Sequence, residues 1–361
     1  MPILPRYLLR QFLPIFALSL GVFTGVLVMN HFVRLFNLAV MKGISPLWIA
    51  GCFARLLPFI AGLAVPMAFL VATLLTLGQL SESGEVTALR ASGFSFGEMT
   101  WPFLAAAAAL SVLLLYVNHK AAPEGFHSFR DDYLSAASRI TRIDFQAGSF
   151  VTLGPWKLFA KKAEPETGRL SGVYLVRQGG SQRPLRVEAE RGRLSLEAGR
   201  GAVLELEDGV LQLPNPDPSR LTSGSFERYA LRVPLAAPIG RRALDIPEMD
   251  TATLRRRLAD PTTSRQHRVE YAVEIAVRSA GALTPLVFFC IAAPLGMRLG
   301  RHSRGFGFAA SLVILFGFYG LLALGIGVGR REAALASVAP WAADAAGLAL
   351  GAVLTRRAMS R

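Results

Sequence analysis

The sequence contains few of the residues from which metal and redox sites are built. It has 2 cysteines and 5 histidines in 361 residues. Cys52 and Cys290 each lie in or beside a long apolar run, so we expect neither a disulfide framework nor a zinc or redox motif. The histidines are scattered along the chain without metal-ligand spacing, at His31, His119, His127, His267 and His302.

Motifs for phosphate binding and hydrolysis are also missing. The sequence has no GxxxxGK[ST], HExxH or GxSxG pattern and no paired CxxC. The segment GIGVG at 325–329 resembles part of a nucleotide fingerprint, but it lies inside an apolar run with no preceding strand. We therefore predict that this chain is not an enzyme and holds no cofactor or metal of its own.

Acidic residues are outnumbered by basic ones, 25 to 39, and the formal net charge is +14. About +5 of this charge falls between residues 119 and 267, and about +9 falls in the more apolar remainder. A basic excess beside apolar runs is typical of membrane orientation and contact with anionic lipids. We prefer that interpretation to nucleic-acid binding.

Long apolar runs are abundant, and each is close to the roughly 20 residues that cross a bilayer. They predict six spanning helices, three on either side of a long polar middle: Gln11–Val33, Leu56–Leu80, Met99–Asn118, Ser279–Met297, Gly305–Gly329 and Ala333–Thr355. The first run is longer than a signal-peptide core and has no small-x-small cleavage site, so we expect it to remain as a span.

The positive-inside rule predicts the orientation. A cytoplasmic N-terminus leaves Arg34, Lys42, Arg330 and Arg331 in the short loops of the opposite face. It places a larger set on the cytoplasmic side: Arg6, Arg10, Arg90, Arg298, Arg301, Arg304, Arg356, Arg357 and Arg361. Both termini are therefore expected in the cytoplasm, and the polar middle outside the inner membrane.

The polar middle, at about 119–267, carries the period-two pattern of half-buried strands between about 145 and 235. Examples are RGRLSLEAG, AVLELEDG and RYALRVPL. The pattern predicts an antiparallel sandwich or barrel, joined to the spans by runs of helix formers at 126–143 and 249–277. It leaves open whether the domain only docks a partner or also holds lipid chains.

The stretch SESGEVTALRASGFS, at about 81–95, is a polar island between the second and third runs. Ser83 suits an N-cap, Glu85 the first helical turn and Gly93 a left-handed C-terminal residue. The island predicts a short cytoplasmic helix carrying Val86, Leu89 and Arg90. Such a helix suits the groove of a separate ATPase, although an ordinary amphipathic connector has the same pattern.

Several residues in or near the spans have more than one interpretation. Glycines four apart, in GVFTG and GIGVG, allow close helix contact either within the chain or with a partner subunit. Arg34 could reach the bilayer surface or bind a phosphorylated head group. Asp344, about halfway along the sixth run, could pair with Arg278, serve a proton path or be structural. With Glu270 or Glu274, Asp344 could also serve an ion-driven carrier.

Four segments together resemble the LptF/LptG (YjgP/YjgQ) permeases of the lipopolysaccharide exporter. They are RYLLRQFLPIF, the run LLPFIAGLAVPMAFLVATLLTLGQLSESGEVTALRASGFS, the run LTPLVFFCIAAPLGMRLGRHSRGFGFAASLVILFGFYGLLALG, and VAPWAADAAGLALGAVL. The resemblance covers nearly the whole chain, and FVRLF is nearer to LptF. It implies an α+β membrane protein with three spans at 1–118, a periplasmic domain at 119–267 containing an antiparallel β-jellyroll, and three spans at 268–361.

The resemblance also implies partners and roles. A cytoplasmic ABC ATPase dimer would bind ATP and Mg, and a second six-helix permease would complete the membrane part. Lipopolysaccharide would pass between them to periplasmic bridge proteins of the LptC/LptA type. By analogy Glu85, with Glu82, Val86, Leu89 and Arg90, would meet the ATPase. Arg34 and Lys42 would meet the lipid, and the first and fifth spans, with Gly21, Gly25, Gly325 and Gly329, would form a lateral gate.

Two alternatives remain at this stage. An ABC permease for a lipoprotein or another glycolipid would have nearly the same sequence features. The family often has Pro and Asn where Ala343 and Asp344 stand, so the sixth span could pack or titrate differently in this chain. An ion-driven carrier is therefore the second alternative, although the sequence shows no clear internal repeat.

Overall fold

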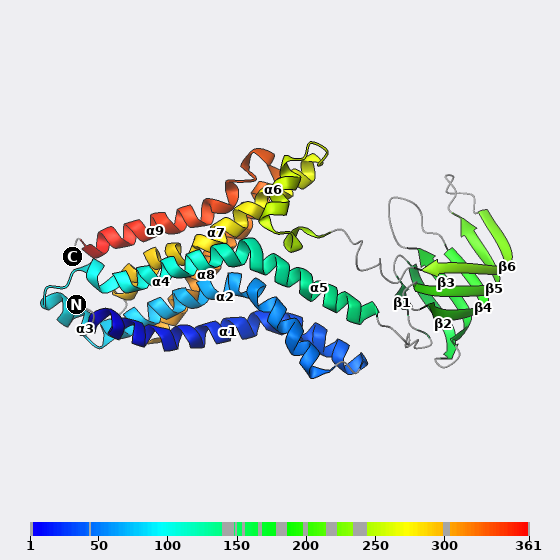
Figure 1. Cartoon of the computed structure of the whole chain (residues 1–361), viewed down its shortest axis with the longest axis horizontal. Helices are drawn as coiled ribbons and strands as arrows, with labels where there is room; N and C mark the ends of the chain where they lie inside the picture. Colours follow the sequence, from blue (N-terminus) through cyan, green and yellow to red (C-terminus); the bar gives the residue numbers. More distant parts are fainter. Residues whose placement is uncertain are drawn as a thin grey trace. The chain divides into compact units, whose positions relative to one another are not determined.

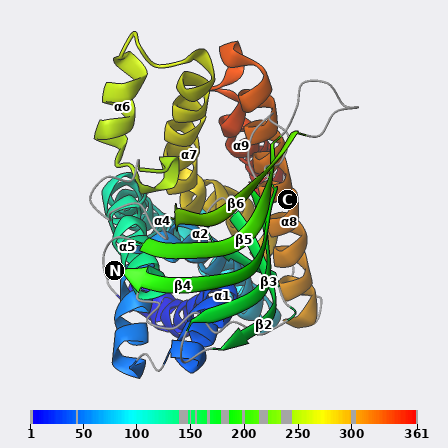
Figure 2. The same cartoon turned by 90° about the vertical axis from the view of Figure 1, so that its right-hand side faces the viewer.

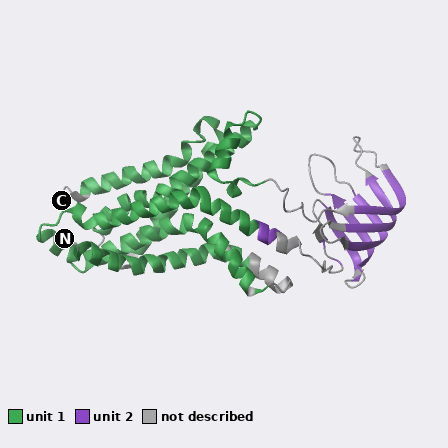
Figure 3. Ribbon diagram, viewed as in Figure 1, with its two compact units in different colours: residues 1–130, 244–361 green, residues 131–243 purple. Residues whose placement is uncertain are grey.

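A computed structural model describes most of the chain, namely residues 3–42, 45–138, 148, 150–153, 156–164, 168–177, 186–197, 201–213, 222–233, 244–298 and 304–359. The chain forms two compact units, which Figure 3 distinguishes by colour. One unit comprises residues 1–130 and 244–361, and the other comprises residues 131–243. The first unit is called the helical unit below, and the second the sheet unit.

The helical unit begins with α1 (Ile3–Lys42), α2 (Pro46–Glu82), α3 (Glu85–Ala91) and α4 (Phe96–Tyr116). A π-helix, η1 (Val117–Ala121), joins α4 to α5 (Ala122–Ser138), whose last turns belong to the sheet unit. After the sheet, the chain forms η2 (Ile246–Glu248), α6 (Thr251–Ala259), α7 (Arg265–Gly296) and α8 (Arg304–Arg331). It closes with the short turns η4 (Ala333–Leu335) and η5 (Ala339–Trp341), followed by α9 (Ala342–Met359).

Five helical segments of the described chain are long and apolar enough to cross a membrane. They are Ile3–Met29, Leu47–Glu82, Phe96–Leu134, Arg265–Gly296 and Gly307–Arg331. The first five predicted spans overlap these segments. The sixth is not among them, because residues 333–341 contain short 3₁₀ turns and α9 has only 18 residues, including Asp344, Arg356 and Arg357. A sixth span therefore stays a prediction.

The core of the helical unit centres on α2, the most buried of the five segments. Phe12 of α1 makes edge-to-face contacts with Phe69 of α2 and Phe103 of α4, with ring centroids 5.7 and 5.6 Å apart. The side chains of Phe69 and Phe103 are fully buried, as is that of Phe288 in α7. These aromatic contacts hold α1 against α2 and α4 near the N-terminal end of α1.

The sheet unit contains one antiparallel sheet of six strands. Figure 2 shows the labelled strands β2 to β6 next to one another. The strands are β1 (Phe150–Leu153), β2 (Trp156–Glu164), β3 (Arg169–Arg177), β4 (Arg186–Glu197), β5 (Gly201–Leu213) and β6 (Thr222–Val233). Each strand pairs with its neighbour in sequence. The predicted alternation is confirmed in β5, where Leu204 and Leu206 are buried and Glu205 and Glu207 are exposed. The described pairings form a meander and include no Greek-key crossover, so a jellyroll stays a prediction.

The helical segment expected at 249–277 is in fact two helices. Asp250 caps α6 by accepting a hydrogen bond from the Thr253 backbone, and α6 ends at Ala259. Hydrogen bonds from Thr253 also hold the pKa of the Asp250 carboxyl below its usual value. Pro261 follows, and Ser264 caps α7 by accepting from the backbone of His267. The predicted run is helical but divides into two helices, because a proline breaks helical hydrogen bonding and a new N-cap follows it.

Candidate functional site

The turn between α2 and α3 depends on glycine. Gly84 is the N-cap of α3 and has a φ of +79°, a conformation that costs other residues free energy. The predicted N-cap, Ser83, is instead the C-terminal cap of α2. Its single hydroxyl hydrogen lies within reach of the carbonyl of Leu80 and the Glu85 carboxylate, and α3 has no side-chain cap hydrogen bond. The prediction that Ser83 caps α3 was wrong because the left-handed turn moves the cap one residue on.

The C-terminal end of α3 has the hydrogen bonds of a Schellman motif. The backbone N–H of Phe94 donates to the carbonyl of Leu89, and that of Gly93 donates to Arg90, each at 3.0 Å. Gly93 has a φ of +90°, as its position in the sequence predicts. Ser95 and Glu98 then form a capping box that begins α4. Helix α3 is therefore bounded by a defined turn on each side.

Glu85 lies in the first turn of α3 and accepts two hydrogen bonds. The Tyr7 hydroxyl of α1 donates to Oε2 at 2.8 Å, and the Ser83 hydroxyl donates to Oε1 at 3.0 Å. Residues 7 and 85 are far apart in sequence, so no spacing rule indicated this contact. The Tyr7 hydrogen bond thus connects α1 directly to Glu85, the carboxylate that the sequence analysis identified.

Apolar side chains attach α3 to the rest of the helical unit. Val86 is 6% exposed and belongs to the main core cluster, and Leu89 packs against that cluster. Glu82 and Arg90 are exposed at the surface. The Ser81 hydroxyl donates to the carbonyl of Met297, just after α7, at 2.9 Å. Figure 1 shows α3 at the same end of the helical unit as the start of α1 and the end of α9.

The left-handed conformation of Gly93 gives a stability prediction. We expect Gly93→Val to weaken α3, because a β-branched residue in this conformation costs about 1–2 kcal/mol. Hydrogen exchange of the α3 amides should accelerate by about tenfold. Gly97→Val is the matched control, because Gly97 lies in α4 without a positive φ and has no atom within 4 Å of an added Cβ. Equal exchange in the two variants would contradict the prediction.

The two predicted glycine pairs have different surroundings. An added Cβ at Gly21 or Gly25 of α1 would meet nothing within 4 Å, and both residues are exposed. A Cβ at Gly325 of α8 would lie 2.4 Å from the carbonyl oxygen of Ala339, and one at Gly329 would lie 3.2 Å from Val273. Contact within the chain, one of the two interpretations of these glycines, therefore does not apply to the α1 pair among the described residues.

The two predicted lipid-binding cations lie near the end of α1. The backbone of Arg34 and Lys42 belongs to that helix. Their side chains lie outside the described residues, so their roles stay predictions. Their place after the first apolar run and the family resemblance support these roles.

Asp344 and Arg278 do not form an ion pair, which was one of the interpretations of Asp344. Asp344 lies in the first turn of α9 and is 4% exposed. Neither of its carboxylate oxygens has a hydrogen-bond partner among the described residues. Arg278 instead donates to the Glu274 carboxylate at 2.9 Å and to the carbonyls of Met249 and Ile246 at 2.7 and 3.2 Å. Helix α7 places Glu274 one turn before Arg278, so the local partner is always within reach.

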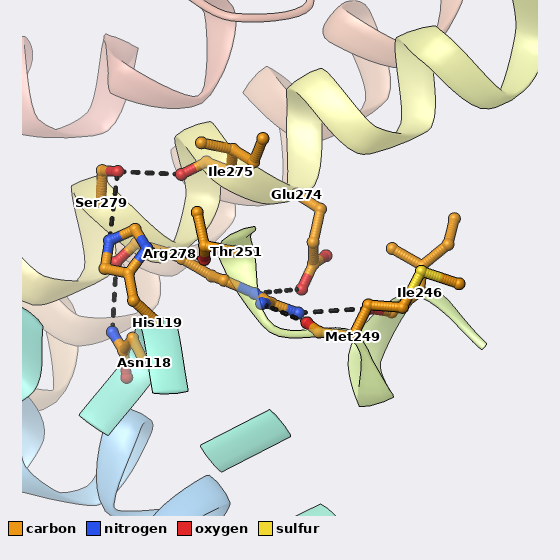
Figure 4. A network of polar contacts seen from close by, with 9 residues as sticks. All are labelled: Asn118, His119, Ile246, Met249, Thr251, Glu274, Ile275, Arg278 and Ser279. Atoms are coloured by element: carbon orange, nitrogen blue, oxygen red, sulfur yellow. Dashed lines mark hydrogen bonds and ion pairs between the residues drawn. The ribbon is translucent and has the colours of Figure 1, made fainter. Parts of the chain in front are cut away.

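Figure 4 shows how this arginine connects α7 to the segment that returns from the sheet unit. A second ionic contact lies beside it, where Arg130 of α5 donates to the buried carboxylate of Glu248 at 2.7 Å. His119 of η1 contacts the Thr251 hydroxyl at 2.8 Å. Helices η1, α5 and α7 thus all contact residues 246–251, the segment that follows the sheet unit.

The described residues contain no group of three or more His, Cys, Asp or Glu side chains that could hold a metal ion. The features that stand out are a short surface helix with an acidic first turn and a set of membrane-length helices.

Comparison with known proteins agrees with this description. No curated protein matches the chain. The family model described as "Lipopolysaccharide export system permease LptF/LptG" matches residues 6–357. The match does not distinguish LptF from LptG. Since it covers nearly the whole sequence, the chain belongs to the LptF/LptG family of lipopolysaccharide export permeases, the non-catalytic transmembrane subunits of an ABC transporter.

Proposed function

We propose that this permease uses α3 to receive the conformational change of a separate ABC ATPase dimer and uses α1 and α8 to admit lipopolysaccharide. The ATPase would bind ATP and Mg, and a second homologous permease would complete the membrane part. The family assignment supports the transport system, and the residues below support the roles within it.

The observation that carries the proposal is the environment of Glu85. Its helix is anchored by Val86 and Leu89, while the first turn stays partly exposed at the end of the helical unit. A rigid attachment transmits a displacement of α3 to α2 and α4, which adjoin it on either side. The Tyr7 hydrogen bond extends the connection to α1. Glu82 and Arg90 would supply exposed charges at the edge of the proposed contact with the ATPase.

The proposed gate uses the two least buried membrane segments. Only 11% of the most apolar window of α1 and 28% of that of α8 are buried within the chain, against 72% for α2. Gly21 and Gly25 leave one face of α1 without side chains, and a Cβ added at either residue would meet no described atom within 4 Å. Small residues let helices approach closely in lipid, so this face suits the second permease or the moving lipid. Gly325 and Gly329 would act differently, by fixing α8 against residues 336–340.

The orientation follows from where charge and termini lie. The starts of α1 and α3 and the end of α9 share one end of the helical unit (Figure 1), and that end carries Arg6, Arg10 and Arg90. We assign it to the cytoplasm by the positive-inside rule. With α9 and the turns before it counted as a sixth span, both termini are cytoplasmic and the sheet unit is periplasmic.

The proposed route of the lipid continues through the sheet unit. Arg34 and Lys42 would bind its anionic head group near the outer leaflet, and the sheet would accept acyl chains. One face of the sheet already gathers ten buried apolar residues. We propose that this sheet belongs to a jellyroll that passes lipopolysaccharide to LptC/LptA-type bridge proteins.

Affinity purification of the tagged chain in mild detergent, followed by mass spectrometry of proteins and lipids, tests the proposal. We expect an ABC ATPase, a second six-helix permease and lipopolysaccharide. Recovery of another amphiphile in place of lipopolysaccharide would refute the proposed cargo. Recovery of the chain alone, under conditions that preserve known complexes, would refute the coupled mechanism and direct attention to Asp344.

A further inference from the structure

A cavity of about 280 Å³ lies inside the helical unit, among α2, η1, α5, α7 and α8. Its walls are mainly apolar and include Phe59, Leu63 and Leu322. Five polar residues also line it, namely Asn118, Glu274, Arg278, Thr284 and Tyr319. Neither the contact at α3 nor the exposed glycine face of α1 uses this space.

The polar wall is built by close approach of three helices. Asn118 lies in the π-helix η1, and such turns occur frequently at functional sites. Its side chain sits between Gly62 of α2 and Gly281 of α7. A Cβ on Gly62 would lie 2.7 Å from Asn118 Oδ1, and one on Gly281 would lie 3.5 Å from Nδ2. The Asn118 amide also donates to the backbone carbonyl of Arg278 at 3.2 Å, as Figure 4 shows.

The charges at this wall balance each other. The Arg278 side chain is 7% exposed and pairs with Glu274 at 2.9 Å, so the pair carries no net charge. A guanidinium has five N–H donors. Three hydrogen bonds of Arg278 have described acceptors, in Glu274, Met249 and Ile246. The remaining donors can meet a neutral oxygen acceptor without adding a second anion.

We propose that this cavity binds one hydrocarbon chain that carries a neutral hydrogen-bonding group, such as a hydroxyl or an ester carbonyl. The apolar walls would take the chain, and Asn118 and Arg278 would take the oxygen. Ligand pockets typically measure about 300–1,000 Å³, so a volume near the lower limit suits a single chain. A bilayer lipid and the exported lipid could both supply such a chain.

Photolabelling tests the proposal on the full chain in phospholipid nanodiscs without lipopolysaccharide. The probe is a long-chain fatty alcohol with a diazirine on its chain, and labelled peptides are identified by mass spectrometry. We expect labelling of α2 and α7 at residues lining the cavity. Gly281→Leu should reduce it by about tenfold, because the leucine side chain occupies the space. Gly317→Leu is the matched control, since a Cβ there meets nothing within 4 Å.

Equal labelling of the wild type and Gly281→Leu would overturn the proposal, because the label would then come from lipid around the protein. A thermal melt checks that the variant folds. If Gly281→Leu does not fold, Asn118→Leu is tested with the alcohol probe and with an alkane probe of the same length that lacks the hydroxyl. The proposal requires the ratio of alcohol labelling to alkane labelling to fall in this variant. An unchanged ratio would refute the proposal.

A competition experiment identifies the lipid that supplies the hydrocarbon chain. Competition by added lipopolysaccharide at the Gly281-sensitive site would support the proposal with the exported lipid as ligand. Labelling that persists there would support it with a bilayer lipid as ligand. Because this readout needs neither ATPase nor transport, its failure is distinguishable from failure of the proposed coupling.

Discussion

Glu85→Lys is expected to abolish lipopolysaccharide export while leaving membrane insertion and abundance intact. Replacing the carboxylate by an ammonium removes the negative charge that the proposed ATPase contact would use and puts a positive charge in its place. Removing one member of a hydrogen-bonded charge pair at an interface costs about 2–5 kcal/mol, so coupling should fall by at least tenfold. The measurement is ATP-dependent release of lipopolysaccharide from proteoliposomes containing the complete complex.

Two controls separate coupling from local structure. Ser83→Ala removes one hydrogen bond to Glu85 and keeps its charge, so we expect export to remain close to normal. Glu82→Lys makes the same charge change at the exposed end of α2 and shows whether Glu82 shares the contact. Normal export by a stably inserted Glu85→Lys variant would refute the coupling role.

Arg278→Met is expected to cause the largest loss of stability in the helical unit. The substitution leaves the Glu274 carboxylate without its cation and two linker carbonyls without their donor. Breaking a buried ion pair by removing one partner costs about 3–5 kcal/mol. We expect a lower midpoint of thermal unfolding in detergent and increased protease cleavage around residues 244–250.

The matched control is Arg268→Met, an exposed position on the same helix, which should change stability by no more than about 0.5 kcal/mol. Adding Glu274→Leu to Arg278→Met should restore part of the loss, because the double variant no longer contains an unpaired carboxylate. Equal melting of Arg278→Met and Arg268→Met would show that the observed contacts of Arg278 contribute no stability.

The short helix shows where local pattern is informative. The expectations for Glu85 in the first turn and for Gly93 beyond the last depended on residues within a few positions of each other, and the structure agrees with both. Ser83 was misassigned because Gly84 also suits the N-cap and its left-handed turn displaces the serine. Two adjacent candidates for one cap differ by less free energy than a sequence pattern can resolve.

The sequence by itself determined the first five membrane-length helices, the alternating strands and the family. Each rests on run length, period two or a motif, and these properties are local. Only the tertiary structure decided that Tyr7 meets Glu85, that Arg278 meets Glu274 and the linker, and that Gly21 and Gly25 face outward. Such contacts depend on the rotation of each helix about its axis. In a helix that is apolar all round, hydrophobic periodicity does not specify that rotation, so packing against neighbouring helices must set it.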